Sequence, residues 1–272
     1  MNPDTDIAKK VRKSAVAGLF YPADPIELKE AVIDYLLHAH DASSEQVIKP
    51  KAIIAPHAGY IYSGPVAASA YHYIEQIKQH ISNVVLIGPS HRVPLLGLAT
   101  SSADYFATPL GNIPINREIV DSINQLPFVT ELDQAHLMEH SLEVHLPFLQ
   151  VALNDFNLVP IVAGDASPDQ VKQLISLACI RDDTLLVISS DLSHYHDYHT
   201  AQKMDLDTCQ AIEALDINRL DSQHACGYIP VKGLLAYARE HRLQAKTVDC
   251  RNSGDTAGPR DQVVGYGSYV FS

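Results

Sequence analysis

Residues 51–57 read KAIIAPH, an apolar run that ends in proline and histidine, and similar runs followed by polar residues recur along the chain. Three further runs rich in Val and Ile lie at residues 83–88, 158–163 and 184–189. Segments with helix-like spacing lie between or after the runs, at residues 64–79, 167–178 and 203–215. Near-continuous hydrophobic strands that alternate with helices are typical of a parallel sheet covered by helices on both faces.

The segment QVVGYGSYVF at residues 262–271 alternates apolar and polar residues more than the other runs do. This alternation favours a closing strand, and therefore a mixed, mostly parallel sheet. We predict an α/β fold, a three-layer sandwich with this sheet between helical layers. Because 46% of the 272 residues are hydrophobic, the chain can form one substantial core. We expect a single domain over residues 1–272, in which residues 1–13 are a loosely ordered N-terminal extension.

The charge distribution argues against nucleic acid as a partner. The formal net charge is −12, and Lys and Arg form no cluster of the kind that binds a phosphate backbone. No apolar run approaches the roughly 18 residues that a membrane span needs, and no apolar segment follows the basic N-terminal residues as in a secretory signal. The four cysteines are widely spaced, which is typical of reduced thiols, so we expect a cytoplasmic protein.

Polar residues with metal-binding or acid–base chemistry follow three of the apolar runs. His57 follows the first run, Ser90 and His91 follow the second, and Asp191 and His194 follow the fourth. In open α/β sheets, ligands bind at the carboxyl ends of the strands. A lone histidine in a loop is more often a hydrogen-bonded structural residue, but three such placements at equivalent points indicate a site.

The stretch EHSLEVHLPFL at residues 139–149 adds further candidates. If it is helical, its spacing aligns Glu139 with Glu143 and brings His140 beside Glu143 on adjoining faces. One face of such a helix could reach the site, which makes His140 a candidate.

Cys226 stands just before a helix that we expect to begin near Ile229 or Pro230, since proline is common in a first turn. A thiol there would feel the positive end of the helix and ionise more readily, which is the form that binds metal or attacks a substrate. The alternative is a small buried residue at a tight turn.

Several motifs point to other activities and are weaker. HLMEH at residues 136–140 fits the inverted zinc-peptidase pattern, but no helix downstream offers the acidic ligand that such a peptidase needs. Neither IGPSH nor SSDLSH is the G-x-S-x-G turn of a serine hydrolase, and no Walker loop or G-x-G-x-x-G turn indicates a nucleotide. HYHDYH at residues 194–199 resembles a loose metal-binding tract, and after His194 we expect a solvated loop.

A longer series of motifs occurs in a fixed order: AGLFYP (17–22), APHAGYIYSG (55–64), IGPSH (87–91), EHSLEVHLPFL (139–149), SSDLSH (189–194), CGYIPV (226–231), NSGDTAG (252–258) and VVGYGSYVF (263–271). This series resembles the Memo family from about residue 14 onward. The number of ordered motifs makes the resemblance far more specific than any single one.

The resemblance implies a fold similar to that of the class III extradiol ring-cleaving dioxygenases, the LigB-like superfamily. Those enzymes bind non-haem iron with two histidines and a glutamate at one sheet edge. The Memo pattern implies His57 and His91 as metal ligands here, with Cys226 in place of the carboxylate. It also implies that Asp191 and His194 line the same pocket, with His140 a further candidate.

The ligand set and the resemblance together suggest two functions. Two imidazoles and a thiolate favour iron(II) or copper, with zinc as a third choice, in a metal-dependent redox enzyme or oxygenase acting on a small-molecule substrate. The residues in catalytic roles would be His194 as acid/base, Asp191 and His140. The alternative is a non-catalytic binding or signalling module whose pocket accepts an anionic or phosphotyrosine-like peptide. The resemblance also suggests a radical-SAM protein as a pathway partner.

Overall fold

The computed structural model describes residues 9–42, 49–153 and 155–272, and its centre is a group of parallel strands. In order across the sheet these are β2 (Ala52–Ala55), β9 (Thr184–Ser189), β3 (Asn83–Pro89) and β8 (Asn157–Ala163). Apart from Asn157, every residue of these strands is buried. The four apolar runs therefore form strands because both faces of the sheet are covered, as their composition predicts.

Antiparallel strands extend the sheet on both sides, which confirms the predicted mixed sheet. Next to β2, β12 (Val263–Phe271) runs antiparallel and pairs in turn with β11 (Ala245–Asn252) and β10 (His194–His196). Next to β8, β4 (Leu98–Thr100) runs antiparallel and pairs with β7 (Val129–Glu131). A separate small sheet consists of β1 (Val11–Arg12), β5 (Tyr105–Thr108) and β6 (Gly111–Pro114).

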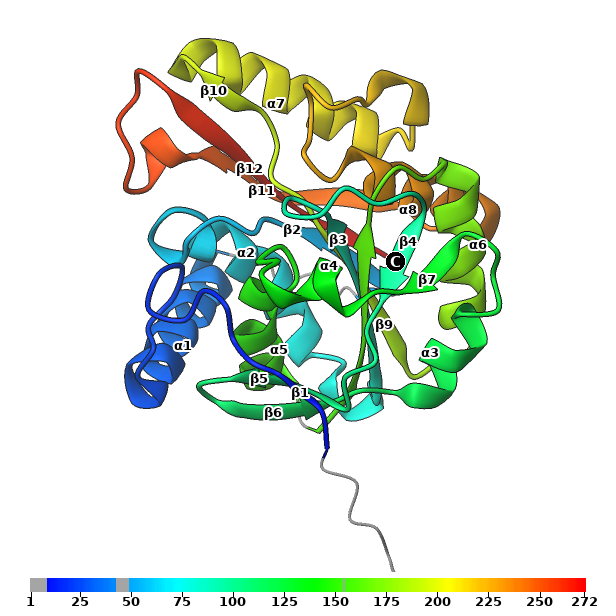
Figure 1. Ribbon diagram of the computed structural model, residues 1–272. Coiled ribbons are helices and arrows are strands. Elements are labelled where there is room, and N and C mark those ends of the chain that lie inside the picture. The colour runs from blue at the N-terminus through cyan, green and yellow to red at the C-terminus, as the bar shows by residue number, and fades with distance from the viewer. Residues whose placement is uncertain (1–8, 43–48, 154) are drawn as a thin grey trace, which may run out of the picture.

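Helices cover both faces of the central sheet, which gives the predicted three-layer sandwich (Figure 1). One layer contains α1 (Pro25–Ala42), α2 (Tyr60–Glu75) and α5 (Leu146–Ala152), which contact one another. The other contains α3 (Arg117–Ile123), α6 (Pro168–Ala178), α7 (Tyr198–Glu213) and α8 (Tyr228–His241). The short elements are α4 (Asp133–Leu137) and the 3-10 helices η1 (Lys78–His80), η2 (Glu143–His145), η3 (Ile217–Arg219) and η4 (Ser253–Asp255).

The expected helices are present, and their ends follow local chemistry. The helix predicted at residues 167–178 is α6, whose N-terminus carries a capping box between Ser167 and Gln170. The helix expected to begin near Ile229 or Pro230 is α8, which begins at Tyr228 with Gly227 as its N-cap. The segment predicted as a closing strand is β12.

The N-terminal segment departs from the expectation of a loose extension. Residues 1–8 lie outside the described residues, but Val11 and Arg12 form β1, parallel to β5. Arg12 is buried and forms an ion pair with Glu143, whose carboxylate also accepts hydrogen bonds from Val16 N and the Tyr21 hydroxyl. A buried guanidinium needs such a partner, and this pair fixes residues 11–16 against the body of the protein.

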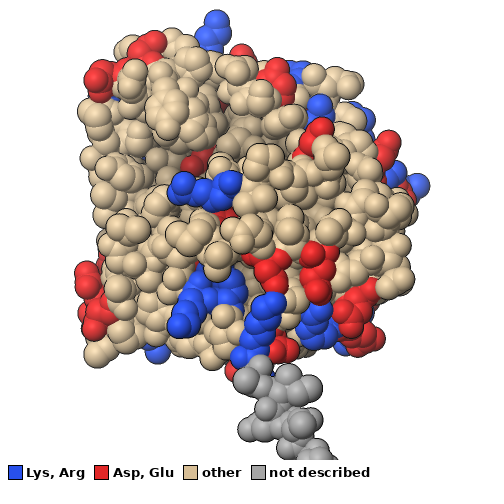
Figure 2. Space-filling view, viewed as in Figure 1, with Lys and Arg blue, Asp and Glu red and all other residues tan. Residues whose placement is uncertain are grey.

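Among the described residues, no helix combines the length and the apolar character that crossing a membrane requires. On the face shown in Figure 2, acidic and basic side chains lie in small separate groups among other residues.

Candidate metal centre

Adjacent parallel strands deliver the candidate residues to one edge of the sheet. His57 follows β2, Asp191 follows β9 and His91 follows β3, and these strands are neighbours in the order β2, β9, β3. Cys226 does not follow one of these strands but lies in the turn before α8. The carboxyl ends of parallel strands meet at one edge, which is why residues far apart in sequence converge here.

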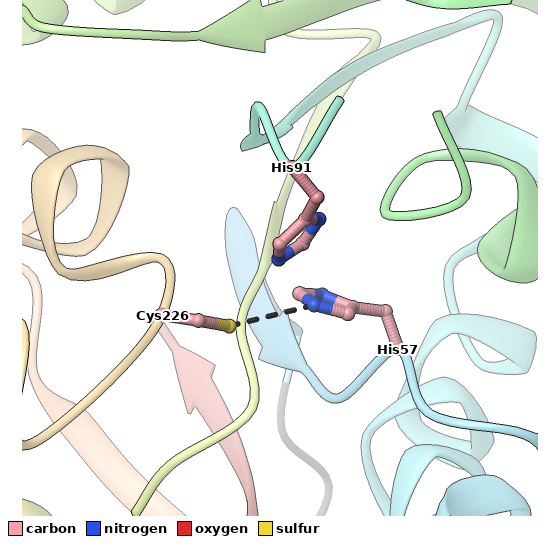
Figure 3. A group of neighbouring side chains, drawn as sticks. All are labelled: His57, His91 and Cys226. Atoms are coloured by element: carbon pink, nitrogen blue, oxygen red, sulfur yellow. Dashed lines mark hydrogen bonds between the residues drawn. The ribbon is translucent and has the colours of Figure 1, made fainter. Parts of the chain in front are cut away.

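His57, His91 and Cys226 form a compact set of donor atoms. One donor atom from each residue lies within 4.8 Å of those of the other two. The sulfur of Cys226 is 3.4 Å from Nε2 of His57, and the ring centroids of the two histidines are 5.1 Å apart. Figure 3 shows a ring nitrogen of His91 directed toward the space between His57 and Cys226. The structure thus brings together the three residues that the sequence suggested as ligands.

Glu139 orients His91 through two hydrogen bonds. Its Oε2 accepts the backbone N–H of His91 at 2.6 Å, and its Oε1 lies 2.9 Å from Nδ1 of the ring. The carboxylate is buried, which alone would raise its pKa, but hydrogen bonds from His91 and Ser141 outweigh burial and lower the pKa to about 2. A carboxylate must receive a proton from Nδ1, so Nε2 of His91 is left free for a ligand.

His57 is held by hydrogen bonds to residues at the end of β9. Its ring is buried, with Nδ1 2.6 Å from the Ser189 hydroxyl, and its backbone N–H donates to Oδ1 of Asp191 at 2.7 Å. Burial, together with the nearby His91 and His140, lowers the pKa of His57 well below its usual value. The ring is therefore neutral, the form in which imidazole binds a metal ion.

The environment of Cys226 corrects the expectation that its thiol ionises readily. Burial, and then the Asp191 carboxyl, raise the pKa of the thiol to about 12, although the backbone N–H of Asp191 donates to the sulfur at 3.3 Å. Cys226 precedes the N-cap of α8, Gly227, and the helix end does not overcome desolvation. An incoming cation must therefore displace the thiol proton.

Gly227 has a steric role beside this thiol. A Cβ atom at this position would lie 2.5 Å from the Ser189 carbonyl oxygen and 2.8 Å from Cβ of Ser190. Only glycine lets the turn that carries Cys226 approach the end of β9 this closely.

Asp191 lies beside the three donors. Its Oδ2 is 4.0 Å from Nε2 of His57, and burial raises its pKa to about 6. Near neutral pH this carboxyl can hold or release a proton next to the cluster.

His140 and His194, the other catalytic candidates, both line the pocket. The ring of His140 stacks on that of His91 with centroids 4.7 Å apart, and burial together with His91 lowers its pKa to about 4. Nδ1 of His194 donates to the Leu192 carbonyl oxygen at 2.8 Å, since a carbonyl can only accept. Nε2 of His194 is therefore the nitrogen that can accept a proton.

A pocket of about 580 Å³ opens over these residues. Its walls include Arg92, Tyr195, His196, Ser222 and Gln223, which were not predicted as site residues.

Tyr195 is 72% exposed and adopts a positive φ of 62°, so its backbone is held in a conformation that non-glycine residues rarely adopt. The alternating polar and aromatic residues after His194 are a signal for this wall, and the expectation of a solvated loop there is wrong. Residues 194–196 instead form β10, and α7 begins at Tyr198.

The segment at residues 139–149 is not the single helix considered from its spacing. The Glu139 carboxylate accepts the backbone N–H groups of His140 and Ser141, each at 3.0 Å, so the side chain takes the donors that a helix would need. Helix α4 ends at Leu137, and His136 donates from Nε2 to the Ala99 carbonyl oxygen at 3.1 Å, away from His140. The HLMEH motif therefore does not form the paired histidine face of a zinc peptidase.

The donor set suits a transition metal ion. Ser189 and Glu139 each hold Nδ1 of one of the two rings, and Nε2 of His57 contacts the Cys226 sulfur at 3.4 Å. One donor atom from each of the three residues lies within 4.8 Å of the others. Two imidazole nitrogens and a sulfur are borderline to soft ligands, which favour iron, copper or zinc over magnesium or calcium. The residues present therefore fit a metal ion, which would be held by His57, His91 and Cys226.

This α/β sandwich, with a His/His/Cys cluster at the carboxyl edge of its parallel strands, defines a class of protein with a candidate metal pocket. The chain belongs to the Memo family, because the family model described as Memo-like protein matches residues 12–270. It is 38% identical over 273 residues to a MEMO1 family protein of Aquifex aeolicus, covering 96% of this chain and 99% of that protein. It is 35% identical over 271 residues to a MEMO1 family protein of Thermoplasma acidophilum, covering 95% and 98%. A solved structure of an uncharacterized protein from Escherichia coli K12 aligns with a TM-score of 0.49 at 11% identity, covering 80% of this chain and 98% of that one.

Proposed function

We propose that this protein is a metal-dependent redox enzyme in which His57, His91 and Cys226 bind iron(II) or copper. The observation that carries the proposal is the convergence of these three donors in the lining of a pocket of about 580 Å³. That volume is in the range of small-molecule sites. The ion would supply one-electron or oxygen chemistry that no side chain in the pocket provides.

The surrounding residues are suited to moving protons for a small-molecule substrate. With its pKa near 6, Asp191 is mostly ionised at pH 7 and can accept a proton from a substrate hydroxyl. His194 presents Nε2 as a second acceptor because Nδ1 is bound to Leu192. With its pKa near 4, His140 is neutral and stacked on His91, so it orients a ligand better than it holds a proton.

The test is metal content by elemental mass spectrometry on untagged protein purified anaerobically. Wild type is compared with His57→Ala, His91→Ala and Cys226→Ala, and with Cys179→Ala as a control, because Cys179 is a free cysteine that does not line the pocket. Near-stoichiometric iron or copper in wild type and the control, lost in the other variants, supports the proposal. A chain that takes up no metal on reconstitution, or that retains it in all variants, contradicts it.

A second function, binding of an anionic ligand without catalysis, is favoured by one observation. The Arg92 guanidinium lines the pocket but makes no hydrogen bond or ion pair with any of the described residues. A guanidinium without a protein partner is available to a carboxylate or phosphate. Titration with phosphotyrosine and with a catechol distinguishes the two functions, since only the enzyme predicts turnover of a substrate under oxygen.

The chemistry of the cysteines is compatible with a cytoplasmic setting, which is part of the proposal. All four are free thiols in the described structure.

A further inference from the structure

The Ser189 hydroxyl, at the end of β9, is a meeting point of three polar groups. Its oxygen lies 2.6 Å from the Ser141 carbonyl oxygen, 2.6 Å from Nδ1 of His57 and 2.9 Å from Nε2 of His145. All four residues are buried, with at most 2% of each exposed, and Ser189 itself is fully buried. The hydroxyl has one hydrogen to donate and two lone pairs to accept with.

The protons around this oxygen can be assigned from the chemistry of its partners. A carbonyl oxygen cannot donate, so the single hydroxyl hydrogen must go to Ser141, whose buried carbonyl would otherwise lack a partner among the described residues. Both imidazoles must then donate to Ser189. Burial lowers the pKa of His145 to about 3, so that ring is neutral and has one N–H. His57 directs Nδ1 at the Ser189 oxygen, and its Nε2 lies 3.4 Å from the Cys226 sulfur, whose thiol can donate to it.

The next partner in the network agrees with this assignment. If His145 donates from Nε2, its Nδ1 must accept, and the Tyr71 hydroxyl lies 2.9 Å from that nitrogen. Burial raises the pKa of Tyr71 well above its usual value, so Tyr71 is a protonated phenol that can donate. The donors therefore run in one direction, from Tyr71 through His145 to Ser189. Because the Ser189 hydrogen is donated to Ser141, His57 must also donate to Ser189.

We infer that Ser189 is a positioning residue that fixes His57 as the Nδ1–H tautomer and thereby presents the unprotonated Nε2 to Cys226 and to a metal ion. The value of this arrangement for metal binding rests on the proposed function, whereas the tautomer itself does not. Ser189 does for His57 what Glu139 does for His91, with a neutral hydroxyl in place of a carboxylate. Ser141 links the two supports, because its N–H donates to Glu139 and its carbonyl oxygen accepts from Ser189.

The tautomers are measured by two-bond proton–nitrogen NMR correlation on metal-free protein labelled with 15N-histidine. Signals are assigned by their loss in His57→Gln and His145→Gln. We expect the Nδ1–H pattern for His57 and the Nε2–H pattern for His145 in the wild type. Nε2–H at His57, or Nδ1–H at His145, overturns the inference without the need for any further variant.

Ser189→Ala tests the dependence on the hydroxyl. We expect the His57 signal to shift toward the Nε2–H or a mixed pattern, and metal affinity to fall by about 10- to 100-fold. The matched control is Thr184→Val, which removes another buried hydroxyl on β9 that has no hydrogen-bond partner among the described residues. An unchanged Nδ1–H pattern in folded Ser189→Ala protein contradicts the inference.

The two readouts separate this inference from the proposed function. If the tautomers are as expected but neither wild type nor variant takes up metal, the metalloenzyme proposal fails and the role of Ser189 stands. If metal binds to wild type and the His57 pattern is the opposite one, the role of Ser189 fails and the metal site stands.

Discussion

The Glu139 carboxylate accepts two hydrogen bonds from His91, one from its backbone N–H at 2.6 Å and one from its ring Nδ1 at 2.9 Å. This contact orients a ring that is partly exposed, with 29% of its side chain accessible. The carboxylate therefore sets the direction in which His91 presents its other nitrogen.

Glu139→Gln keeps the size of the side chain but removes its charge and one acceptor. We expect the affinity for a transition metal to fall by about 10- to 100-fold, because His91 loses its anionic partner. Competition against a chromophoric chelator measures the change. Glu131→Gln, which alters an exposed partner of Arg117, is the control and should bind metal like wild type. Equal affinities in both variants would show that Glu139 does not support the site.

Gly227→Ala places a methyl group against the end of β9. Its Cβ would lie 2.5 Å from the Ser189 carbonyl oxygen, so the turn that carries Cys226 must move. We expect a loss of about 1–3 kcal/mol in the free energy of unfolding, together with reduced metal stoichiometry. Urea denaturation and elemental analysis measure these effects. Gly59→Ala is the matched control at the N-cap of α2, where the nearest atom would be 3.6 Å from Cβ. The same loss in both variants would contradict the steric explanation.

Arg12→Ala leaves the Glu143 carboxylate buried without its cationic partner. The side chains of Arg12 and Glu143 are 5% and 0% exposed, and removing one member of such a pair typically costs about 3–5 kcal/mol. We expect a loss of that size in urea denaturation. Lys51→Ala breaks an ion pair with Asp182 whose side chains are largely exposed, and it should cost less than about 1 kcal/mol. A small effect of Arg12→Ala would mean that the N-terminal segment contributes little to stability.

Asp205 predicts a specific dependence of stability on pH. Burial raises its pKa to about 6 from a usual value of 3.8, and Oδ2 has no hydrogen-bond partner among the described residues. Between these two pH values the folded state binds more protons than the unfolded state, so stability falls as pH rises through this window and then levels off. The shift corresponds to a loss of up to ~3 kcal/mol between pH 4 and pH 7.

Asp205→Asn should remove this part of the pH dependence, since the amide does not titrate. Thermal denaturation at pH 4, 5, 6 and 7 measures the slope for wild type and variant. Asp207→Asn, on the exposed side of the same helix, serves as the control and should keep the wild-type slope. A slope in Asp205→Asn that matches wild type would place the titrating group elsewhere.

The sequence predicts the sheet and the strand-end residues well, for a physical reason. Strands buried on both faces need nearly continuous apolar residues, so β2, β3 and β9 are recognisable and their ends place His57, His91 and Asp191. This placement requires only that the carboxyl ends of parallel strands lie at the same edge of the sheet.

The supporting contacts could not be predicted in the same way. Residues 139–149 have the spacing of a helix. Only the hydrogen bonds that the Glu139 carboxylate accepts from the backbone N–H groups of His140 and Ser141 show why no helix forms there. The raised pKa of Cys226 depends on burial by segments remote in sequence. Ser189 is one of several serines that lie within or after strands. Its hydrogen bonds to His145 and Ser141 depend on how these residues lie in space, which the spacing of residues along the sequence does not reveal.

The separation of the candidate ligands along the chain bears on the order in which they become available. His57 and Cys226 are 169 residues apart. At a synthesis rate of roughly 5–20 residues per second, a ribosome takes roughly ten to thirty seconds to travel from one codon to the other. From His91 onward, the nascent chain carries both imidazoles but not yet the Cys226 thiol. The strands that place both imidazoles are complete at Ser189, so Cys226 is the last of the three candidate ligands to be made and completes a donor set whose other members already have their strands.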